Sequence, residues 1–222
     1  MAALNVRSVL VTGSNRGIGL ELIRQLAGKS KSPEFIFATC RDPAGPQAQD
    51  LKNLAAKNQG IEIIPLDTCK PSSIKAAVAK VTEQLKGSGL NLLINNAGIV
   101  KPFTALESET PEGMLEVYKT NVVGTMMVSQ AFLPLLRKAS HESSQKGMSC
   151  SKAAIVNLSS ECGSITNLLA WEIAHILNYR CSKMPAPMTV EEGVQKILDT
   201  LSQLSEKDSG TFVDLEGKVL PW

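Results

Sequence analysis

Short apolar runs alternate with helical patterns along this chain, and that alternation limits what it can fold into. The apolar runs are 6–12, 35–39, 61–66, 90–94 and 153–158, and the helical patterns between them are 17–28, 47–57, 72–86 and 111–138. Strands separated by helices form βαβ units, whose parallel strands are covered by helices on both faces. Near-continuous apolar strands agree with this, because both faces of such a sheet are buried. The sequence predicts an α/β fold with a doubly wound parallel sheet in three layers.

The last third of the chain carries one further well-marked helix. Thr189 is a candidate N-cap, and Glu192 stands where a capping box needs an acid. The apolar stripe of this helix consists of Val190, Val194, Ile197, Leu198, Leu201 and Leu204. We expect a short strand at 211–214 to follow it, and a surface loop at 139–152 to precede the fifth strand.

Length, charge and cysteine usage narrow the class of protein. The 222 residues fit a single domain, expected to span residues 1–222. The net charge of +2 predicts neither nucleic acid nor membrane as a partner. Five cysteines without a C-x-x-C pair argue against a disulfide framework and a metal site. They fit a reducing compartment, and we expect the protein to be cytoplasmic.

The first strand-to-helix junction is rich in glycine. Gly13 permits a tight turn, Gly17 lets the backbone approach a pyrophosphate, and Gly19 permits close packing of helix on sheet. Free N–H groups at the helix start would meet the phosphate charge. The candidate phosphate-binding residues are Gly13, Ser14, Asn15, Arg16, Gly17, Ile18 and Gly19.

The end of the second strand indicates which dinucleotide would bind. An acid there accepts hydrogen bonds from a ribose 2′-OH, whereas an arginine pairs with a 2′-phosphate. Arg41 follows this strand and Arg16 lies in the glycine loop, and together they favour NADPH. Asp42 leaves NADH open if its carboxylate faces the ribose. The pair Arg41–Asp42 also fits a solvated surface turn.

Five motifs in order carry a family resemblance. They are Thr12-Gly-x-x-x-Gly-Ile-Gly19, Asn95-Asn96-Ala97-Gly98, Asn121-Val122, Ser159-Ser160 and Tyr179-x-x-x-Lys183. In this order they resemble the motifs of the short-chain dehydrogenases/reductases. The amino-acid sequences near the two ends of the chain resemble those of the C-factor/sniffer-like carbonyl reductases, which use NADPH. The resemblance covers nearly the whole chain. It implies a Rossmann-like fold, NADPH as cofactor and a small-molecule carbonyl compound as substrate.

The resemblance also implies roles for individual residues. Asn96, Ala97 and Gly98 would wall the adenosine side of the cofactor, and Asp67 would contact the adenine ring. Asn121 resembles the helix asparagine that anchors a water-linked proton path. Its alternative role is a helix-bending polar residue satisfied by backbone.

The residue types of the last two motifs fit proton transfer to a carbonyl oxygen. A free tyrosine has a pKa of about 10, and a nearby lysine ammonium lowers it. Tyr179 and Lys183 are four residues apart and share a helix face, and Lys183 would also hold the nicotinamide ribose. Ser160, preferred to Ser159 on the family pattern, would orient the carbonyl oxygen. The apolar segment 165–178 fits either a substrate-pocket wall or ordinary core packing.

The chain departs from the family pattern directly after Lys183. Met184 and Pro185 follow at once, and the region of a sixth strand is missing, so the C-terminal half is incomplete. Helices at this place commonly build dimers in the family; a homo-oligomer is therefore in question here. The alternative to a reductase is a non-catalytic dinucleotide-binding or interaction protein.

Overall fold

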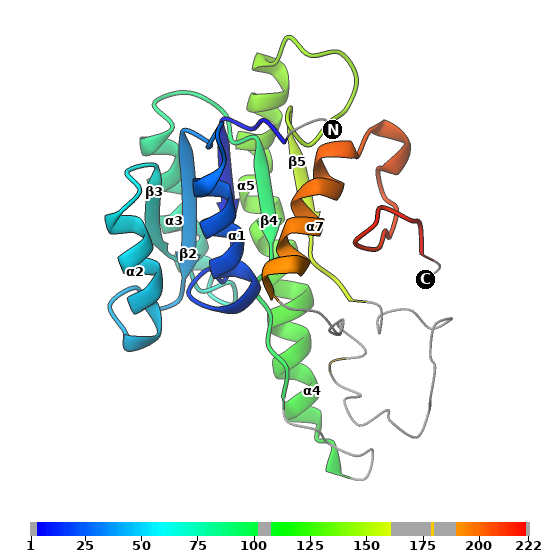
Figure 1. Cartoon of the computed structure of the whole chain (residues 1–222). Helices are drawn as coiled ribbons and strands as arrows, with labels where there is room; N and C mark the ends of the chain where they lie inside the picture. Colours follow the sequence, from blue (N-terminus) through cyan, green and yellow to red (C-terminus); the bar gives the residue numbers. More distant parts are fainter. Residues whose placement is uncertain (1–3, 102–107, 161–178, 180–189, 221–222) are drawn as a thin grey trace.

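Five parallel strands form the centre of the molecule. The computed structural model describes residues 4–101, 108–160, 179 and 190–220. The strands are β1 (Ser8–Val11), β2 (Phe35–Cys40), β3 (Ile61–Pro65), β4 (Leu92–Asn95) and β5 (Ala154–Asn157). Their order in the sheet is β3-β2-β1-β4-β5, with every neighbouring pair parallel (Figure 1). The predicted parallel sheet is confirmed.

Helices cover both faces of this sheet. They are α1 (Gly17–Gly28), α2 (Gln49–Ala56), α3 (Pro71–Gln84), α4 (Pro111–Tyr118), α5 (Thr125–Glu142) and α7 (Val190–Gln203). In Figure 1, α1, α2 and α7 lie in front of the sheet, and α3 and α5 lie behind it. The expected three-layer arrangement is therefore confirmed.

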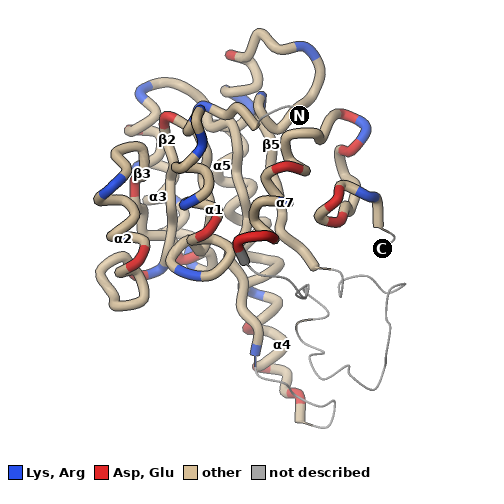
Figure 2. Tube along the Cα trace, in the orientation of Figure 1, with Lys and Arg blue, Asp and Glu red and all other residues tan. Residues whose placement is uncertain are grey.

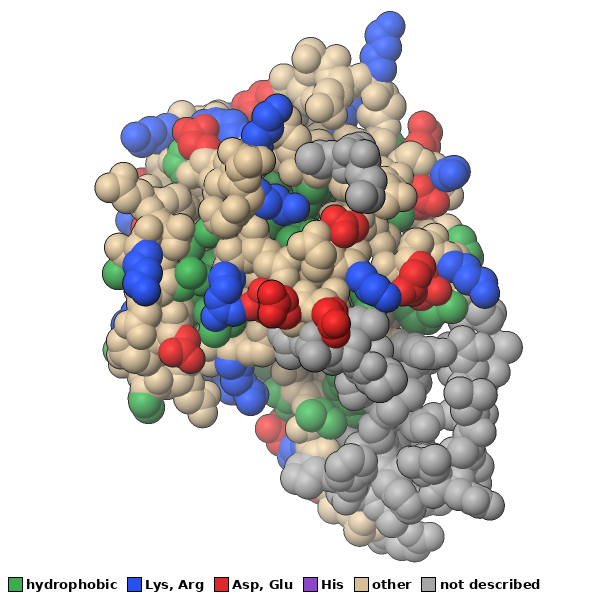
Figure 3. Space-filling model, viewed as in Figure 1, with side chains coloured by type: hydrophobic (Ala, Val, Ile, Leu, Met, Phe, Trp, Pro, Cys, Tyr) green, Lys and Arg blue, Asp and Glu red, His purple; other side chains and the backbone are tan. Residues whose placement is uncertain are grey.

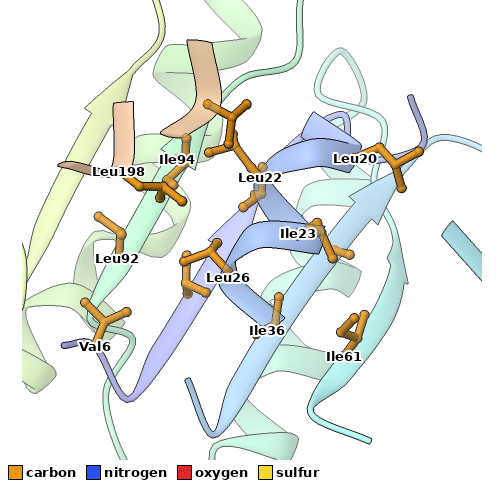
Figure 4. Packing of buried hydrophobic residues seen from close by; sticks show 14 of the residues in the cluster. Val6, Leu20, Leu22, Ile23, Leu26, Ile36, Ile61, Leu92, Ile94 and Leu198 are labelled. Atoms are coloured by element: carbon orange, nitrogen blue, oxygen red, sulfur yellow. The ribbon is translucent and has the colours of Figure 1, made fainter. Parts of the chain in front are cut away.

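Strand alternation divides the apolar residues between two cores. Val9 and Val11 pack on the side of α1, α2 and α7, whereas Leu10 packs on the side of α3 and α5. Figure 4 shows Leu22 and Leu26 of α1 in the first of these cores. Both faces of the central strands are therefore dry, which explains their near-continuous apolar sequences.

The apolar stripe of α7 faces this first core. Val194, Leu198 and Leu201 are buried, and α7 packs against α1. Gln25 of α1 also donates a hydrogen bond to the carbonyl oxygen of Glu191, at 3.0 Å. The predicted late helix is present, and the proposed cap at Thr189 lies outside the described residues.

The long helical pattern at 111–138 is interrupted. A π-helical segment, Lys119–Gly124, separates α4 from α5, and α5 continues to Glu142, so the loop expected from residue 139 begins four residues later. Gly124 packs so closely on Thr68 that a Cβ would lie 3.0 Å from the Thr68 hydroxyl. The contact between Gly124 and Thr68 lies in this wider, π-helical turn. Hydrophobic periodicity does not predict such a turn.

The strand expected at 211–214 is replaced by a narrow hairpin. Val213 forms an isolated antiparallel bridge with Val219, and Asp214 accepts hydrogen bonds from the N–H groups of Glu216 and Lys218. Gly217 turns the chain with a φ of 79°. Within the described residues β5 is the edge of the sheet, so this segment pairs with itself.

Charges are dispersed over the described surface. Figure 2 shows basic and acidic residues interspersed along the tube, and Figure 3 shows both signs on the face formed by α1, α2 and α7. None of the described helices is long and apolar enough to cross a bilayer.

Candidate functional site

The order of the strands creates a crevice at one edge of the sheet. The chain runs from β1 outward through β2 and β3, then returns to place β4 on the other side of β1. Ligands of open α/β sheets bind where the strand order reverses in this way, beyond the carboxyl ends of the strands. Here that point lies between Thr12, after β1, and Asn96, after β4.

The glycine loop after β1 has the conformation expected of it. Gly13 and Gly17 have φ values of 68° and 54°, which favour glycine. A Cβ on Gly17 would meet nothing within 4 Å, so this glycine borders open space. A Cβ on Gly19 would lie 2.2 Å from the carbonyl oxygen of Gly13, so Gly19 lets the start of α1 approach the loop itself closely.

Hydrogen bonds fix the glycine loop to the end of β4. The hydroxyl of Thr12 accepts from the backbone N–H groups of Asn96 and Ala97, at 3.0 and 2.9 Å. The side-chain amide of Asn96 donates to the carbonyl oxygens of Thr12 and Gly13, at 2.8 and 3.1 Å. Asn96 and Ala97 therefore shape the loop itself, in addition to lining its far side.

The helix that follows the loop begins with an uncapped end. The N-cap residue Arg16 makes no side-chain capping hydrogen bond, and Gly17 and Ile18 in the first turn are exposed. The first N–H groups of a helix lack intrahelical partners, and the helix dipole adds partial positive charge there. The loop and α1 together present a site for an anionic group.

The two arginines and the acid after β2 differ in their partners. Arg16 and Arg41 are exposed, and their guanidinium groups have no hydrogen bond or ion pair with any described residue. Asp42 accepts hydrogen bonds from the N–H groups of Ala44 and Gly45, at 3.0 Å each. Burial raises the pKa of the adjacent Cys40 thiol, and the charge of Asp42 adds to that rise.

Asp67 lies in the turn between β3 and α3. Its carboxylate accepts a hydrogen bond from the Cys69 N–H at 3.0 Å and forms an ion pair with Lys70 at 3.3 Å. The Asp67 N–H donates to the hydroxyl of Ser73, which ties the turn to α3. The Asp67 carboxylate thus contacts residues of its own turn, at the sheet edge where the carboxyl ends of the strands lie.

Asn121 is buried in the π-helical segment and holds the chain after β4. Its side-chain oxygen accepts from the Ile99 N–H at 2.8 Å, and its amide donates to the Ile99 carbonyl oxygen at 3.0 Å. Its own carbonyl oxygen accepts from the Thr125 hydroxyl at 2.9 Å. The side chain therefore fixes the backbone at Ile99.

Polar side chains that the sequence reasoning missed connect the ends of β4 and β5. The amide of Asn95 donates to Ser129 of α5 and to Asn157 of β5, at 2.9 Å each. Asn95 and Asn157 are opposed in the parallel register. Their spacing in the sequence gives no signal of this contact, and only the register brings them together.

Ser160 follows β5 and is buried, whereas Ser159 is exposed. The Ser160 hydroxyl is buried and has no hydrogen-bond partner among the described residues. A buried polar group without a partner is a candidate contact for a ligand. Tyr179 is half-buried. The described residues do not include Lys183, the apolar segment 165–178 or the break after Lys183. They contain no cluster of side chains that could hold a metal ion.

Comparison with known proteins decides the family. A family model described as short chain dehydrogenase matches residues 7–188. The chain belongs to the short-chain dehydrogenase family. The chain spans less than half the length of the first curated relatives that it matches.

Solved structures of carbonyl reductases superpose closely on this chain. An NADPH-bound carbonyl reductase from chicken fatty liver is 46% identical, with a TM-score of 0.95 over 100% of this chain and 96% of that one. The carbonyl reductase Sniffer of Drosophila melanogaster is 31% identical, with a TM-score of 0.88 over 98% and 100%. The expected similarity to sniffer-like carbonyl reductases is confirmed.

One full-length relative indicates missing positions. An uncharacterised oxidoreductase of Schizosaccharomyces pombe is 25% identical over 253 positions, covering 96% of each chain. Because this chain has only 222 residues, at least 31 of the 253 positions have no counterpart in it.

Proposed function

We propose that the chain is an NADPH-dependent carbonyl reductase acting on a ketone or aldehyde. The observation that carries this proposal is the glycine cradle between β1 and β4, in which Gly17 borders open space at the uncapped start of α1. The similarity to the NADPH-bound chicken reductase supports the cofactor.

The residues of the cradle fit a dinucleotide. Backbone N–H groups of the loop from Gly13 to Gly19 would bind the pyrophosphate, and Arg16 and Arg41 would pair with the 2′-phosphate. Asn96 to Gly98 and Asp67 would border the adenosine. When bound, NADPH would supply the hydride.

The remaining site residues would handle the carbonyl group and its proton. Tyr179 would donate its phenolic proton to the carbonyl oxygen, and the Lys183 ammonium would lower the pKa of Tyr179 and hold the nicotinamide ribose. The unpaired hydroxyl of Ser160 would donate a hydrogen bond to the same oxygen. Asn121 would keep the backbone after β4 in place and anchor the path that returns a proton to Tyr179.

The chain offers a matched pair of variants for this proposal, because Tyr118 and Tyr179 are its two tyrosines. With a panel of aldehydes and ketones, Tyr179→Phe should reduce NADPH oxidation to background while NADPH still binds. Tyr118→Phe, on the exposed side of α4, should retain the wild-type rate. Equal rates for wild type and Tyr179→Phe would remove Tyr179 from the reaction.

A second candidate is a dinucleotide-binding protein without turnover. The departure of the sequence from the family pattern directly after Lys183, where Met184 and Pro185 follow at once, favours it. This candidate predicts NADPH binding without carbonyl-dependent oxidation. Turnover that scales with protein concentration would contradict it.

We also propose that residues 1–222 form one domain that works in the cytoplasm. The free thiols of Cys40, Cys69 and Cys150 support a reducing compartment. Fractionation of cells that produce the protein would test this, and recovery of the protein from an oxidising compartment would contradict it.

A further inference from the structure

The loop after β2 contains a tight turn that begins at Asp42. The carboxylate oxygen Oδ1 of Asp42 accepts hydrogen bonds from the N–H groups of Ala44 and Gly45, at 3.0 Å each. The Gly45 N–H also lies 3.4 Å from the carbonyl oxygen of Asp42. Asp at the first position, Pro43 at the second and Gly45 at the fourth are the residues that a type I turn prefers. The sequence itself therefore specifies this turn.

The second carboxylate oxygen of Asp42 packs against Gly45. A Cβ at Gly45 would lie 2.5 Å from this Oδ2 atom and 3.0 Å from the carboxyl carbon. Gly45 has an ordinary φ of −68°, so the glycine is needed for space and not for its backbone conformation. The turn thus holds the carboxylate through Oδ1, while Oδ2 occupies the space that a Gly45 side chain would need and the Asp42 side chain remains exposed.

The same turn is anchored to its surroundings. Lys52 of α2 donates to the carbonyl oxygen of Ala44 at 3.3 Å, and Asn15 of the glycine loop contacts the carbonyl oxygen of Gln47 at 3.5 Å. The Ser14 N–H donates to the carbonyl oxygen of Thr39 at 2.8 Å, which joins the glycine loop to the end of β2. Arg41 lies between these attachments.

We propose that Asp42 is a positioning residue that makes the site select NADPH over NADH. Its turn would direct the carboxylate toward the N–H groups of Ala44 and Gly45, away from a ribose 2′-OH, and would place the neighbouring Arg41 where it could meet a 2′-phosphate. A free acid at this strand end would do the opposite, because it would accept hydrogen bonds from the 2′-OH. This inference rests on the proposed function, since it assumes that the cradle binds a nicotinamide dinucleotide.

Two substitutions at Asp42 separate its turn from its charge. Asp42→Asn keeps an Oδ1 acceptor for both N–H groups but removes the charge, whereas Asp42→Ala removes both. Dissociation constants for NADPH and NADH would be measured by calorimetry on each purified protein. Asp42→Ala should lower the preference for NADPH by about tenfold or more. This is the effect expected when Arg41 loses one charge-assisted hydrogen bond to the 2′-phosphate. Asp42→Asn should keep the wild-type preference within about twofold, which is a change of less than 0.5 kcal/mol.

Arg41→Ala identifies the route of the effect. If Asp42 acts through Arg41, the double variant should lose no more preference than Arg41→Ala alone. Gly45→Ala keeps Asp42 but displaces its carboxylate, so it should lose preference as Asp42→Ala does, even if Asp42→Ala fails to fold.

The outcomes distinguish this inference from the proposed function. A wild-type chain that binds neither cofactor contradicts the proposed function itself. A wild-type preference for NADPH that Asp42→Ala and Gly45→Ala leave unchanged contradicts only the positioning role. A similar gain in NADPH affinity for Asp42→Ala and Asp42→Asn also overturns it, because Asp42 would then act only by repelling the phosphate.

Discussion

Two buried serines differ in what their hydroxyl groups contact. Ser8 donates to the carbonyl oxygen of Gly89 at 3.2 Å and accepts from the Asn91 N–H at 3.0 Å. The hydroxyl of Ser160 is equally inaccessible but has no partner among the described residues. A polar group that is buried and unpaired costs free energy, and a site retains it when a ligand needs it.

This contrast predicts opposite effects of removing the two hydroxyl groups. Ser8→Ala should lower the free energy of unfolding by about 1–3 kcal/mol, because the Asn91 N–H is left buried and unsatisfied. Ser160→Ala should leave it unchanged or raise it, while carbonyl reduction falls. Urea unfolding and activity measurements on both variants test this. A large loss of stability in Ser160→Ala would indicate that the Ser160 hydroxyl has a structural partner.

At the residue scale, the sequence predicts where the backbone requires glycine better than it predicts which side chains hydrogen-bond to one another. Gly13 and Gly19 could be assigned to a turn and a close approach because their spacing after a strand leaves little choice. The contacts of Asn95 with Ser129 and Asn157 could not be predicted, since they depend on strand register and on the rotation of α5. The local sequence indicates a turn at Asp42, but it does not show that the Asp42 carboxylate accepts two hydrogen bonds within that turn.

At the scale of elements, α7 tests whether the chain after the break belongs to the same folding unit. Leu198 is buried in the core shared by α1 and the sheet, close to Leu22 (Figure 4). Gln195 lies on the exposed side of the same helix, and among the described residues its side chain bonds only to Asp199 of that helix, at 2.9 Å. The two side chains therefore form a matched pair.

We expect Leu198→Ala to lower the free energy of unfolding by about 2–5 kcal/mol, because it leaves a cavity in a dry core. Gln195→Ala should change it by no more than about 0.5 kcal/mol. The measurement is urea unfolding followed by circular dichroism. Equal, negligible effects of both substitutions would mean that α7 does not dock on α1 in solution.

Hydrophobic periodicity predicts the existence of elements but not their interruptions. The pattern at 111–138 predicts helix throughout, yet the π-helical segment at Lys119–Gly124 divides it. The interruption depends on Asn121 binding the Ile99 backbone and on Gly124 packing against Thr68, contacts between parts distant in the sequence. The hairpin near Val213 was missed for a related reason, because strand pairing is decided by which neighbour is present.

At the scale of the whole molecule, the described residues of the candidate site lie partly in the centre of the sheet and partly at its edge. The phosphate cradle is built from β1, β2, β4 and α1, all of which lie inside the central sheet and its cover. Ser160, in contrast, follows β5, an edge strand of the described sheet, where Ile155 is 38% exposed. We therefore expect the proposed cofactor binding to depend on the well-packed part, and the proposed turnover to depend on the residues after β5.

The most direct test of this account is a thermal melt of the purified protein with NADPH, with NADH and without cofactor. A ligand that binds only the native state stabilises it by RT ln(1 + [L]/Kd), about 2.7 kcal/mol at a hundred times Kd. The account predicts a cooperative transition that NADPH raises more than NADH does.

One pair of variants makes the melt specific to the cradle. Gly17→Asp places a carboxylate in the open space at the start of α1, in a conformation that aspartate tolerates, and should abolish the NADPH shift. The same substitution at Gly28, which also borders open space at the other end of α1, should preserve it. A wild-type melt that neither cofactor raises would contradict the central claim that this fold holds a working dinucleotide site.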